Sequence, residues 1–307
     1  MILKKTVSNK VDKPFLNEQV RVKETGNVIE LMCMKHVNRT CFIRKLDNDH
    51  YIDIRTGELK EANHIENRSQ NMNSVRNSLA RLRDLINANV VNVLNCRWVT
   101  LTYAQPDGKP MTDTVRLYKD YEHYIKRLHR RYGSFEYIVA MEPQGSGSWH
   151  AHVILIFPSK APYIPNDEMS SIWGQGFTVT KRLDNVDNVG AYLTAYLGDM
   201  EMEEFFHSFP SVRYTDGIKE VEIEVNGQKK IKRYVKGGRL YFYPPNFNLY
   251  RCSRGCKKPV VSYMTEKRAE EKVSSAKLTF QRSVYLEDDE TGKNNSITYR
   301  YYNFSRK

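Results

Sequence analysis

The sequence lacks any apolar run long enough to span a membrane, and its opening residues, MILKKTVSNK, lack the apolar stretch of a secretory signal. It also lacks internal repeats, low-complexity tracts and the phosphate-binding loop of an ATP-driven motor, G-x-x-x-x-G-K followed by Ser or Thr. We therefore expect a cytoplasmic protein that has no membrane partner and no helicase fused to it.

Cysteine is scarce. The five cysteines are an odd number with irregular spacing, so a disulfide framework is not expected. Cys33, His36 and Cys41, joined by Cys252 and Cys256 from far downstream, would supply enough ligands for a zinc site. However, the gaps between the cysteines differ from the two-residue spacing of a zinc knuckle. Structural cysteines are therefore the favoured interpretation, and zinc is the alternative.

Positive charge is in excess, because 48 Lys and Arg residues oppose 36 Asp and Glu residues, for a formal net charge of +12. This excess favours a polyanionic partner such as nucleic acid, although an ordinary basic cytosolic protein has a similar balance. Three basic stretches are candidate DNA contacts, and a solvated surface is the alternative for each. They are Lys126, Arg127, Arg130 and Arg131; Lys181 and Arg182; and Arg251, Arg254, Lys257 and Lys258.

The residue pattern predicts an α+β chain with a core domain over residues 71–260, an N-terminal extension over 1–70 and a C-terminal basic extension over 261–307. The N-terminal extension is expected to contain short strands around a turn at 47–49. The C-terminal extension is expected to contain a short charged helix and a polar hairpin, rather than a second core.

Within the core domain, apolar residues at helical spacing predict helices over 73–88 and 116–132. Runs of β-branched and aromatic residues predict strands. The expected strands cover residues 97–103, 136–142, 149–157, 177–182, 219–225, 229–235 and 240–243. A short helix is expected near 167–173. Asp187 or Asn188 is expected to cap a further helix that runs to residue 200.

A metal site is predicted on the hairpin around the loop 143–148. His150 and His152 lie two apart on one strand, so their side chains leave the same face. The loop folds Glu142 back to a position opposite His150, or one residue pair away. Two imidazoles and a carboxylate with open coordination positions suit a catalytic divalent cation, Mn²⁺ or Mg²⁺. The alternative is a pair of histidines with structural roles only.

A second candidate group lies on the expected helix 187–200. Tyr192 and Tyr196 are four residues apart, so they share one helix face. A tyrosine hydroxyl can attack a phosphodiester and conserve the energy of the bond as phosphotyrosine, and two tyrosines can open and close a strand in turn. The alternative is that both are core aromatics, because Leu193 and Leu197 lie on the same side of the helix.

Three motifs in a fixed order carry a family resemblance. They are the strand Trp98–Tyr103, the pair His150-Ala151-His152, and Tyr192-x-x-x-Tyr196. In this order they resemble the motifs of HUH-superfamily endonucleases, and specifically those of the rolling-circle replication initiators (Rep) of Gram-positive plasmids and phages. The resemblance extends over residues 73–259.

The resemblance implies both a fold and an activity. The fold is a five-stranded antiparallel sheet flanked by helices, with the histidine strand at its centre. The activity is nicking and rejoining of single-stranded DNA at a replication origin. Glu142, His150 and His152 match the metal ligands of the family. Tyr192 matches the nucleophile that keeps the 5′ phosphate and leaves a free 3′ hydroxyl, and Tyr196 matches the second tyrosine of two-tyrosine members.

The same resemblance implies partners. These are single-stranded or hairpin origin DNA in the cytoplasm of a bacterial host, with a host helicase and polymerase as separate proteins. One departure concerns the phosphate. Many relatives carry a lysine between or just after the tyrosines, where this sequence has Ala195, Gly198 and Asp199. A cation that steadies the phosphate must then come from elsewhere, with Lys181 and Arg182 as candidates.

Other functions remain open at this stage. Conjugative relaxases resemble a permuted arrangement with an early tyrosine and usually a third histidine, so the motif order favours an initiator. Transposases of the superfamily share the order found here. An origin-binding protein without catalysis would shift DNA in a gel but would not cleave it. A metal-dependent hydrolase would keep its turnover after replacement of both tyrosines by phenylalanine.

Overall fold

The computed structural model describes residues 3–10, 14, 16–37, 41–62, 64–183, 199–212, 217–225, 228–288 and 294–305. The chain divides into two compact units. The first unit joins both ends of the sequence, residues 1–65 and 258–307, and the second comprises residues 66–257. Among the described helices, none is long and apolar enough to cross a membrane.

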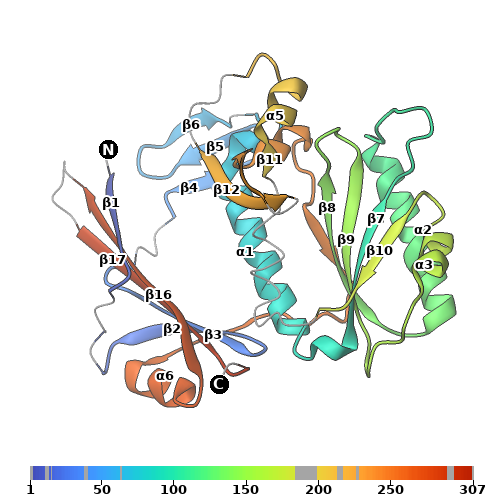
Figure 1. The fold of residues 1–307 in the computed structure, drawn as a ribbon. Helices are drawn as coiled ribbons and strands as arrows, with labels where there is room; N and C mark the ends of the chain where they lie inside the picture. Colours follow the sequence, from blue (N-terminus) through green and yellow to red (C-terminus); the bar gives the residue numbers. More distant parts are fainter. Residues whose placement is uncertain are drawn as a thin grey trace. The chain divides into compact units, whose positions relative to one another are not determined.

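A five-stranded antiparallel sheet forms the centre of the second unit (Figure 1). Its strands lie in the order β10-β7-β9-β8-β14. Their bounds are Cys96–Thr102 for β7, Glu136–Pro143 for β8, Trp149–Ile156 for β9, Thr178–Lys181 for β10 and Tyr250–Cys252 for β14. The histidine strand β9 is therefore central, as its continuous apolar run predicts. The helices and antiparallel sheets together confirm the α+β class.

Helices cover both faces of this sheet. α1 (Met72–Asn89) packs on one face through a cluster that includes Leu82 and Ile86. α2 (Thr114–Tyr132) and α3 (Asn166–Trp173) contribute to a larger cluster on the other face. Figure 1 shows α1 and α2 on opposite sides of the strands. These three elements confirm the helices expected near 73–88, 116–132 and 167–173.

The sequence explains where α2 begins and ends. The Asp113 carboxylate accepts hydrogen bonds from the backbone N–H groups of Val115 and Arg116, which would otherwise have no partner in the first turn. Gly133 follows the last turn with a φ of 75°, a conformation that favours glycine. Between these ends, apolar residues at helical spacing, Leu117 and Leu128 among them, are fully buried. α2 thus closes one face of the sheet.

A smaller sheet in the same unit has the order β11-β13-β12. Its strands are β11 (Met200–Glu201), β12 (Ile218–Val225) and β13 (Gln228–Val235), and α5 (Met202–Ser208) follows β11. The hairpin of β12 and β13 confirms the strands expected over 219–225 and 229–235. Its expected turn at 226–227 lies outside the described residues. Short 3₁₀ helices η1 (Arg68–Asn71) and η2 (Val93–Asn95) flank α1.

The strand predicted over 240–243 is wrong. These residues belong to a 3₁₀ helix, η3 (Gly238–Phe242), and its last flanking residue. Gly237 begins the turn with a φ of 72°, and its carbonyl accepts the Leu240 N–H at 2.9 Å. Leu240 and Tyr243 then join the hydrophobic cluster of the main sheet. The two adjacent glycines and this packing override the strand preference of the aromatic residues.

The first unit contains a six-stranded antiparallel sheet in the order β1-β16-β17-β3-β2-β15. Its strands are β1 (Leu3–Ser8), β2 (Gln19–Thr25), β3 (Val28–Met34), β15 (Val260–Thr265), β16 (Lys277–Asp288) and β17 (Asn294–Asn303). α6 (Glu266–Val273) packs against β2 and β15. β4 (Ile43–Lys45), β5 (His50–Asp53) and β6 (Glu58–Glu61) form a separate sheet around the expected turn.

The terminal segments are not two separate extensions. The C-terminal helix and hairpin form as expected, but β17 pairs with β3 and β16 pairs with β1. Both ends of the chain also contribute to one hydrophobic cluster, with Val20 and Leu31 from the N-terminal side and Ala269 and Val273 from the C-terminal side. The first unit is therefore a second core, built from segments that are distant in sequence.

Candidate metal centre

Three ligating side chains meet on the hairpin of β8 and β9. Glu142 is the direct cross-strand partner of His150, so its carboxylate projects from the same face of the sheet. Ala140 pairs with His152 one step further along the hairpin. The loop between the strands is closed by the Gln144 N–H, which donates to the Ser148 carbonyl at 2.8 Å. The expected placement of Glu142 opposite His150 is the one observed.

The three side chains leave the face of the sheet that α1 packs on. Their neighbours on β9, Ala151 and Val153, point to the other face and belong to the cluster with α2 and α3. Further along β9, Ile154 joins the α1 cluster. His150 and His152 therefore continue the apolar row that α1 covers.

The geometry of the group is compact. Ligand atoms of Glu142, His150 and His152 all lie within 4.8 Å of one another. Glu142 Oε2 lies 3.2 Å from His152 Nε2 and 3.9 Å from His150 Nε2. The Glu142 side chain is 3% exposed, whereas those of His150 and His152 are 13% and 22% exposed. One carboxylate oxygen thus faces both imidazoles in a site that is nearly, but not fully, closed to solvent.

The His152 ring is held by the neighbouring strand β7. Its Nδ1 lies 3.3 Å from Thr100 Oγ1, and the Trp98 indole N–H donates to the same hydroxyl oxygen at 3.3 Å. Thr100 Oγ1 can accept from both groups, which keeps the His152 proton on Nδ1 and frees Nε2 as a ligand atom. The Trp98 ring also packs edge-on against His152, with centroids 5.7 Å apart. The motif strand thereby orients a metal ligand.

Arg239 holds the other carboxylate oxygen of Glu142. Its Nη1 donates to Glu142 Oε1 at 2.5 Å, so Oε1 is engaged while Oε2 faces the imidazoles. The Arg239 side chain is 25% exposed, and its guanidinium reaches the edge of the site. A charge-assisted bond to a nearly buried carboxylate fixes the orientation of that carboxylate. Arg239 is therefore part of the candidate centre.

The ionisation states suit metal binding. Burial, and then the neighbouring His152, lower the pKa of His150 to about 4, so its imidazole is neutral and keeps a free lone pair at neutral pH. Burial raises the pKa of Glu142, but the hydrogen bond from His152 and the charge of Arg239 outweigh it, and the pKa lies below its usual value. The carboxylate is therefore charged where it meets the two imidazoles.

The residues fit a divalent cation. Both ring nitrogens of His150 are buried and have no hydrogen-bond partner in the described part of the chain. Orphaned nitrogens of this kind are costly unless something binds them. Two imidazole nitrogens and a carboxylate oxygen form a donor set for Mn²⁺ or Mg²⁺, with coordination positions left for other ligands. Within the described ranges, this is the group of His, Cys, Asp and Glu residues placed to hold a metal.

Sequence reasoning missed Arg239. It lies 97 residues after Glu142, on η3, and no motif surrounds it. η3 is set in place by its glycines: the Gly237 N–H donates to Asp199 Oδ1 at 3.1 Å, and a Cβ on Gly238 would lie 2.8 Å from the Cβ of Met200. The pair of glycines before a lone arginine is the one local signal that marks a close approach here.

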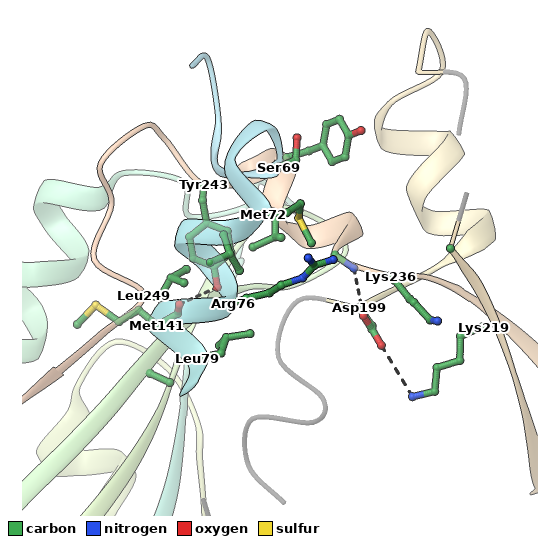
Figure 2. Close-up of a pocket in the computed structure, with 16 residues that line it drawn as sticks. Ser69, Met72, Arg76, Leu79, Met141, Asp199, Lys219, Lys236, Tyr243 and Leu249 are labelled. Atoms are coloured by element: carbon green, nitrogen blue, oxygen red, sulfur yellow. Dashed lines mark hydrogen bonds and ion pairs between the residues drawn. The ribbon is translucent and has the colours of Figure 1, made fainter. Parts of the chain in front are cut away.

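The same glycines border a pocket of about 740 Å³ (Figure 2). Met72, Arg76 and Leu79 reach into it from α1. Its floor includes Ala140, which pairs with His152, and Met141, whose carbonyl accepts the Tyr243 hydroxyl at 2.9 Å. Across the pocket, Asp199 lies 3.9 Å from the ammonium group of Lys219. The pocket is thus mostly apolar, with cations at its rim.

The predicted tyrosine helix lies outside the described residues, which stop at 183 and resume at 199. Tyr192 and Tyr196 are within that interval. Where the chain resumes, β11 pairs with β13 at Met200 and Val235, and Asp199 binds the residue that begins η3. The first described residue after the interval is therefore tied directly to the element that carries Arg239.

The basic stretch on α2 is placed away from the metal centre. α2 packs on the opposite face of the sheet, and Arg127 donates to the carbonyls of Ile172 and Trp173 at 2.6 and 2.9 Å. Lys126 pairs with Glu122 and Arg131 with Glu168. Arg130 is exposed on the same helix. At least Arg127 has a structural role in joining α2 to α3.

The other basic candidates are dispersed. Lys181 is the cross-strand partner of Trp98 and so shares the face of the metal centre, with Arg182 exposed next to it. Arg251 lies 3.7 Å above the ring centroid of Tyr118. Arg254 and Lys257 are exposed in the turn after β14, and Lys258 begins the C-terminal part of the first unit. The structure does not bring all of these cations into one patch.

The cysteines do not assemble a zinc site in the described residues. All five are free thiols, and the group that could hold a metal contains no cysteine. Cys33 and Cys41 belong to the first unit, whereas Cys252 and Cys256 belong to the second. Cys256 lies within the α1 cluster, in agreement with the structural interpretation.

The metal centre lies in the part of the chain that has known relatives. Residues 96–201 match the family model of the ORF2-type replication-associated proteins. The matched segment begins at β7, includes all three candidate ligands and ends at β11, so the resemblance to replication-associated proteins is confirmed at this level. Arg239 lies beyond it. No curated protein matches the chain.

Proposed function

We propose that the chain is a rolling-circle replication initiator of the HUH type, which nicks single-stranded origin DNA and rejoins strands at termination. The observation that carries the proposal is the Glu142, His150 and His152 group, formed on one hairpin inside the segment that matches replication-associated proteins. A replication protein with a partly open site for a divalent cation is suited to phosphodiester chemistry.

The reaction is a transesterification. The oxygen of Tyr192 attacks the scissile phosphorus and loses its proton, and the bond from phosphorus to the 3′ oxygen breaks. The products are a 5′ phosphotyrosine and a 3′ hydroxyl, which takes up a proton and primes synthesis. Tyr196 repeats the attack on a second strand at termination. No bond energy is lost, because one phosphodiester replaces another.

The residues of the centre each have a defined task. Glu142, His150 and His152 hold the divalent cation, which draws charge from the scissile phosphate when it is bound. Thr100 and Trp98 keep the His152 ring in its ligating orientation. Arg239 fixes Glu142 and supplies positive charge at the rim of the site, in the role that a lysine near the tyrosines has in many relatives.

The expected DNA substrate is a single strand or an extruded hairpin, because the scissile phosphate must reach both the tyrosine and the metal centre. Within the described chain, no phosphate-binding loop of a motor accompanies the site, so we propose that a separate host helicase unwinds the duplex and a host polymerase extends the 3′ hydroxyl. The chain would act in the cytoplasm of a bacterial host.

The experiment is a covalent capture on single-stranded DNA that carries the origin region of the replicon. The protein is incubated with Mn²⁺, Mg²⁺ or chelator and analysed on a denaturing gel. We expect a metal-dependent protein–DNA adduct that disappears in Tyr192→Phe or in the double variant with Tyr196→Phe. Tyr163→Phe is the control, because Tyr163 is 80% exposed and distant in sequence from the motifs.

The outcome separates the proposal from its alternatives. DNA binding without an adduct under any metal would identify an origin-binding protein. Cleavage that survives in the double tyrosine variant would identify a metal-dependent hydrolase. An adduct that forms on transposon or transfer-origin DNA, but not on a replication origin, would assign the same chemistry to a transposase or a relaxase.

A further inference from the structure

The six-stranded sheet of the first unit has one covered face and one that α6 does not cover. Val20 and Val22 of β2 and Leu31 of β3 pack with Ala269 and Val273 of α6 on the covered face. The covered face also holds an ion pair between Arg300 and Glu266, whose side chains are 3% and 2% exposed. Residues that alternate with these along each strand project to the other side of the sheet.

On that other side, cross-strand pairing aligns side chains in two adjacent rows across five strands. The first row contains Tyr263, Arg21, Met32, Tyr299 and Arg282. The second row contains Val261, Lys23, Glu30, Tyr301 and Phe280. We call these ten residues the aromatic face. Four of its members are aromatic and three are basic, and neighbouring strands stand about 4.8 Å apart.

The aromatic face exposes ring surface to solvent. Tyr263 is 67% exposed and Phe280 is 47% exposed, and Val261 between the rows is 44% exposed. The rings of Phe280 and Tyr301 meet edge to face with centroids 5.5 Å apart. Exposed rings spread across one sheet face mark a surface that binds something, because a sheet that only has to be soluble carries polar residues there.

The charge of the aromatic face is positive. Its acidic member, Glu30, is neutralised by Lys23 at 2.8 Å and by Arg21 at 3.3 Å. Three basic side chains therefore oppose one carboxylate. The Nε of Arg282 is buried and has no hydrogen-bond partner among the residues that the structure describes. A donor in this state, next to Tyr299 in the same row, is suited to an anionic ligand.

We propose that the aromatic face is a binding site for single-stranded DNA, with bases stacked on Tyr263 and Phe280 and phosphates paired with Arg282 and Arg21. Flat rings accept any base, and cations between them follow the backbone, so the site holds a strand without reading its sequence. The choice of DNA rests on the proposed function. The surface itself lies outside the segment that matches replication-associated proteins.

The site would add a second point of attachment for the strand. Binding of one strand at two sites on one chain raises the effective concentration of DNA at the metal centre, because the second contact is intramolecular. A nicking enzyme that must keep hold of a displaced strand benefits from such a contact. The inference deepens the proposed function but does not require that the chain cleaves DNA.

The test measures binding of the full chain to fluorescent oligodeoxythymidylate of about 15 nucleotides, in chelator so that no cleavage occurs. The double variant Tyr263→Leu with Phe280→Leu removes two rings and keeps apolar bulk. We expect its dissociation constant to rise at least about tenfold. Tyr263→Phe keeps the ring and is expected to bind like the wild type. Tyr163→Leu, at an exposed tyrosine of the other unit, is the matched control.

A second measurement uses charge. Arg282→Gln is expected to weaken binding and to reduce the slope of log affinity against log salt by about 0.7, the value for one phosphate contact on a single strand. Circular dichroism and thermal melting of each variant report the fold. Because Tyr263 and Phe280 are largely exposed, their replacement is expected to leave the melting temperature unchanged.

Two outcomes would overturn the proposal. One is a folded double variant that binds oligodeoxythymidylate as tightly as the wild type. The other is a wild-type dimer that the double variant converts to monomer with unchanged DNA affinity, since the aromatic face would then join two copies of the chain. If the wild type binds through this face but forms no metal-dependent adduct, the proposed function fails and this inference stands.

Discussion

Arg239 Nη1 donates to Glu142 Oε1 at 2.5 Å, while Glu142 Oε2 lies 3.2 Å from His152 Nε2. The two oxygens of one carboxylate are thus divided between a guanidinium from η3 and the imidazoles of β9. This division couples an element beyond the matched family segment to the metal centre within it.

Replacement of Arg239 by alanine is expected to weaken metal binding. Loss of a residue that orients a metal ligand costs about 10- to 100-fold in affinity, because the carboxylate is free to turn away. Isothermal titration with Mn²⁺ measures this directly. Arg239→Lys keeps the charge and is expected to recover part of the affinity. Unchanged Mn²⁺ affinity in folded Arg239→Ala would show that Arg239 does not position Glu142.

His152→Ala is expected to abolish both Mn²⁺ binding and adduct formation, because it removes one of three ligands and leaves Glu142 Oε2 with a poorer partner. The control is His123→Ala, since His123 is exposed on α2, which packs on the opposite side of the sheet. Equilibrium dialysis with Mn²⁺ and the covalent capture gel provide the two readouts. A variant that loses adduct formation but binds Mn²⁺ normally would contradict the assignment of His152 as a ligand.

Arg127 is expected to affect stability rather than DNA binding. Its guanidinium donates to two backbone carbonyls at the end of α3, and removal leaves those acceptors without their partner. We expect Arg127→Met to lower the free energy of unfolding by about 1–3 kcal/mol in urea titration. Lys126→Met, which removes an exposed pair with Glu122, is expected to change it by less than about 0.5 kcal/mol. A loss of DNA affinity in Arg127→Met without a loss of stability would restore the phosphate-contact interpretation.

Burial raises the pKa of the Cys96 thiol to about 12, so the thiol stays protonated at pH 8 and cannot react as a thiolate. Cys41 is exposed. We therefore expect an aromatic disulfide reagent to modify Cys41 first in the native protein and to reach Cys96 only after unfolding. Mass spectrometry of peptides from a time course identifies the modified residues. Zinc released on modification would instead support the metal-bound cysteines considered from the sequence.

Local patterns predicted the parts of the site that are close in sequence. The loop 143–148 brings Glu142 back beside His150 within one hairpin, so alternation along two short strands was enough to place all three ligands. The helices α1 and α2 followed from apolar residues at a helical period. In each case the interaction that fixes the structure joins residues a few positions apart.

Parts that depend on distant pairing were not predicted. Arg239 reaches Glu142 across 97 residues, and η3 forms where aromatic residues favoured a strand. The terminal segments meet through the pairing of β17 with β3, which no local pattern indicates because either strand could pair with any edge. The tyrosines remain predictions, since Tyr192 and Tyr196 lie outside the described residues.

The most direct test of the central claim is to find the atom that carries the DNA. The metal-dependent adduct is purified, digested with nuclease and protease, and analysed by tandem mass spectrometry. The account predicts a nucleotide joined through its 5′ phosphate to Tyr192, or to Tyr196 in the Tyr192→Phe variant. A nucleotide on any other residue, or none in the presence of Mn²⁺ and bound origin DNA, would contradict it.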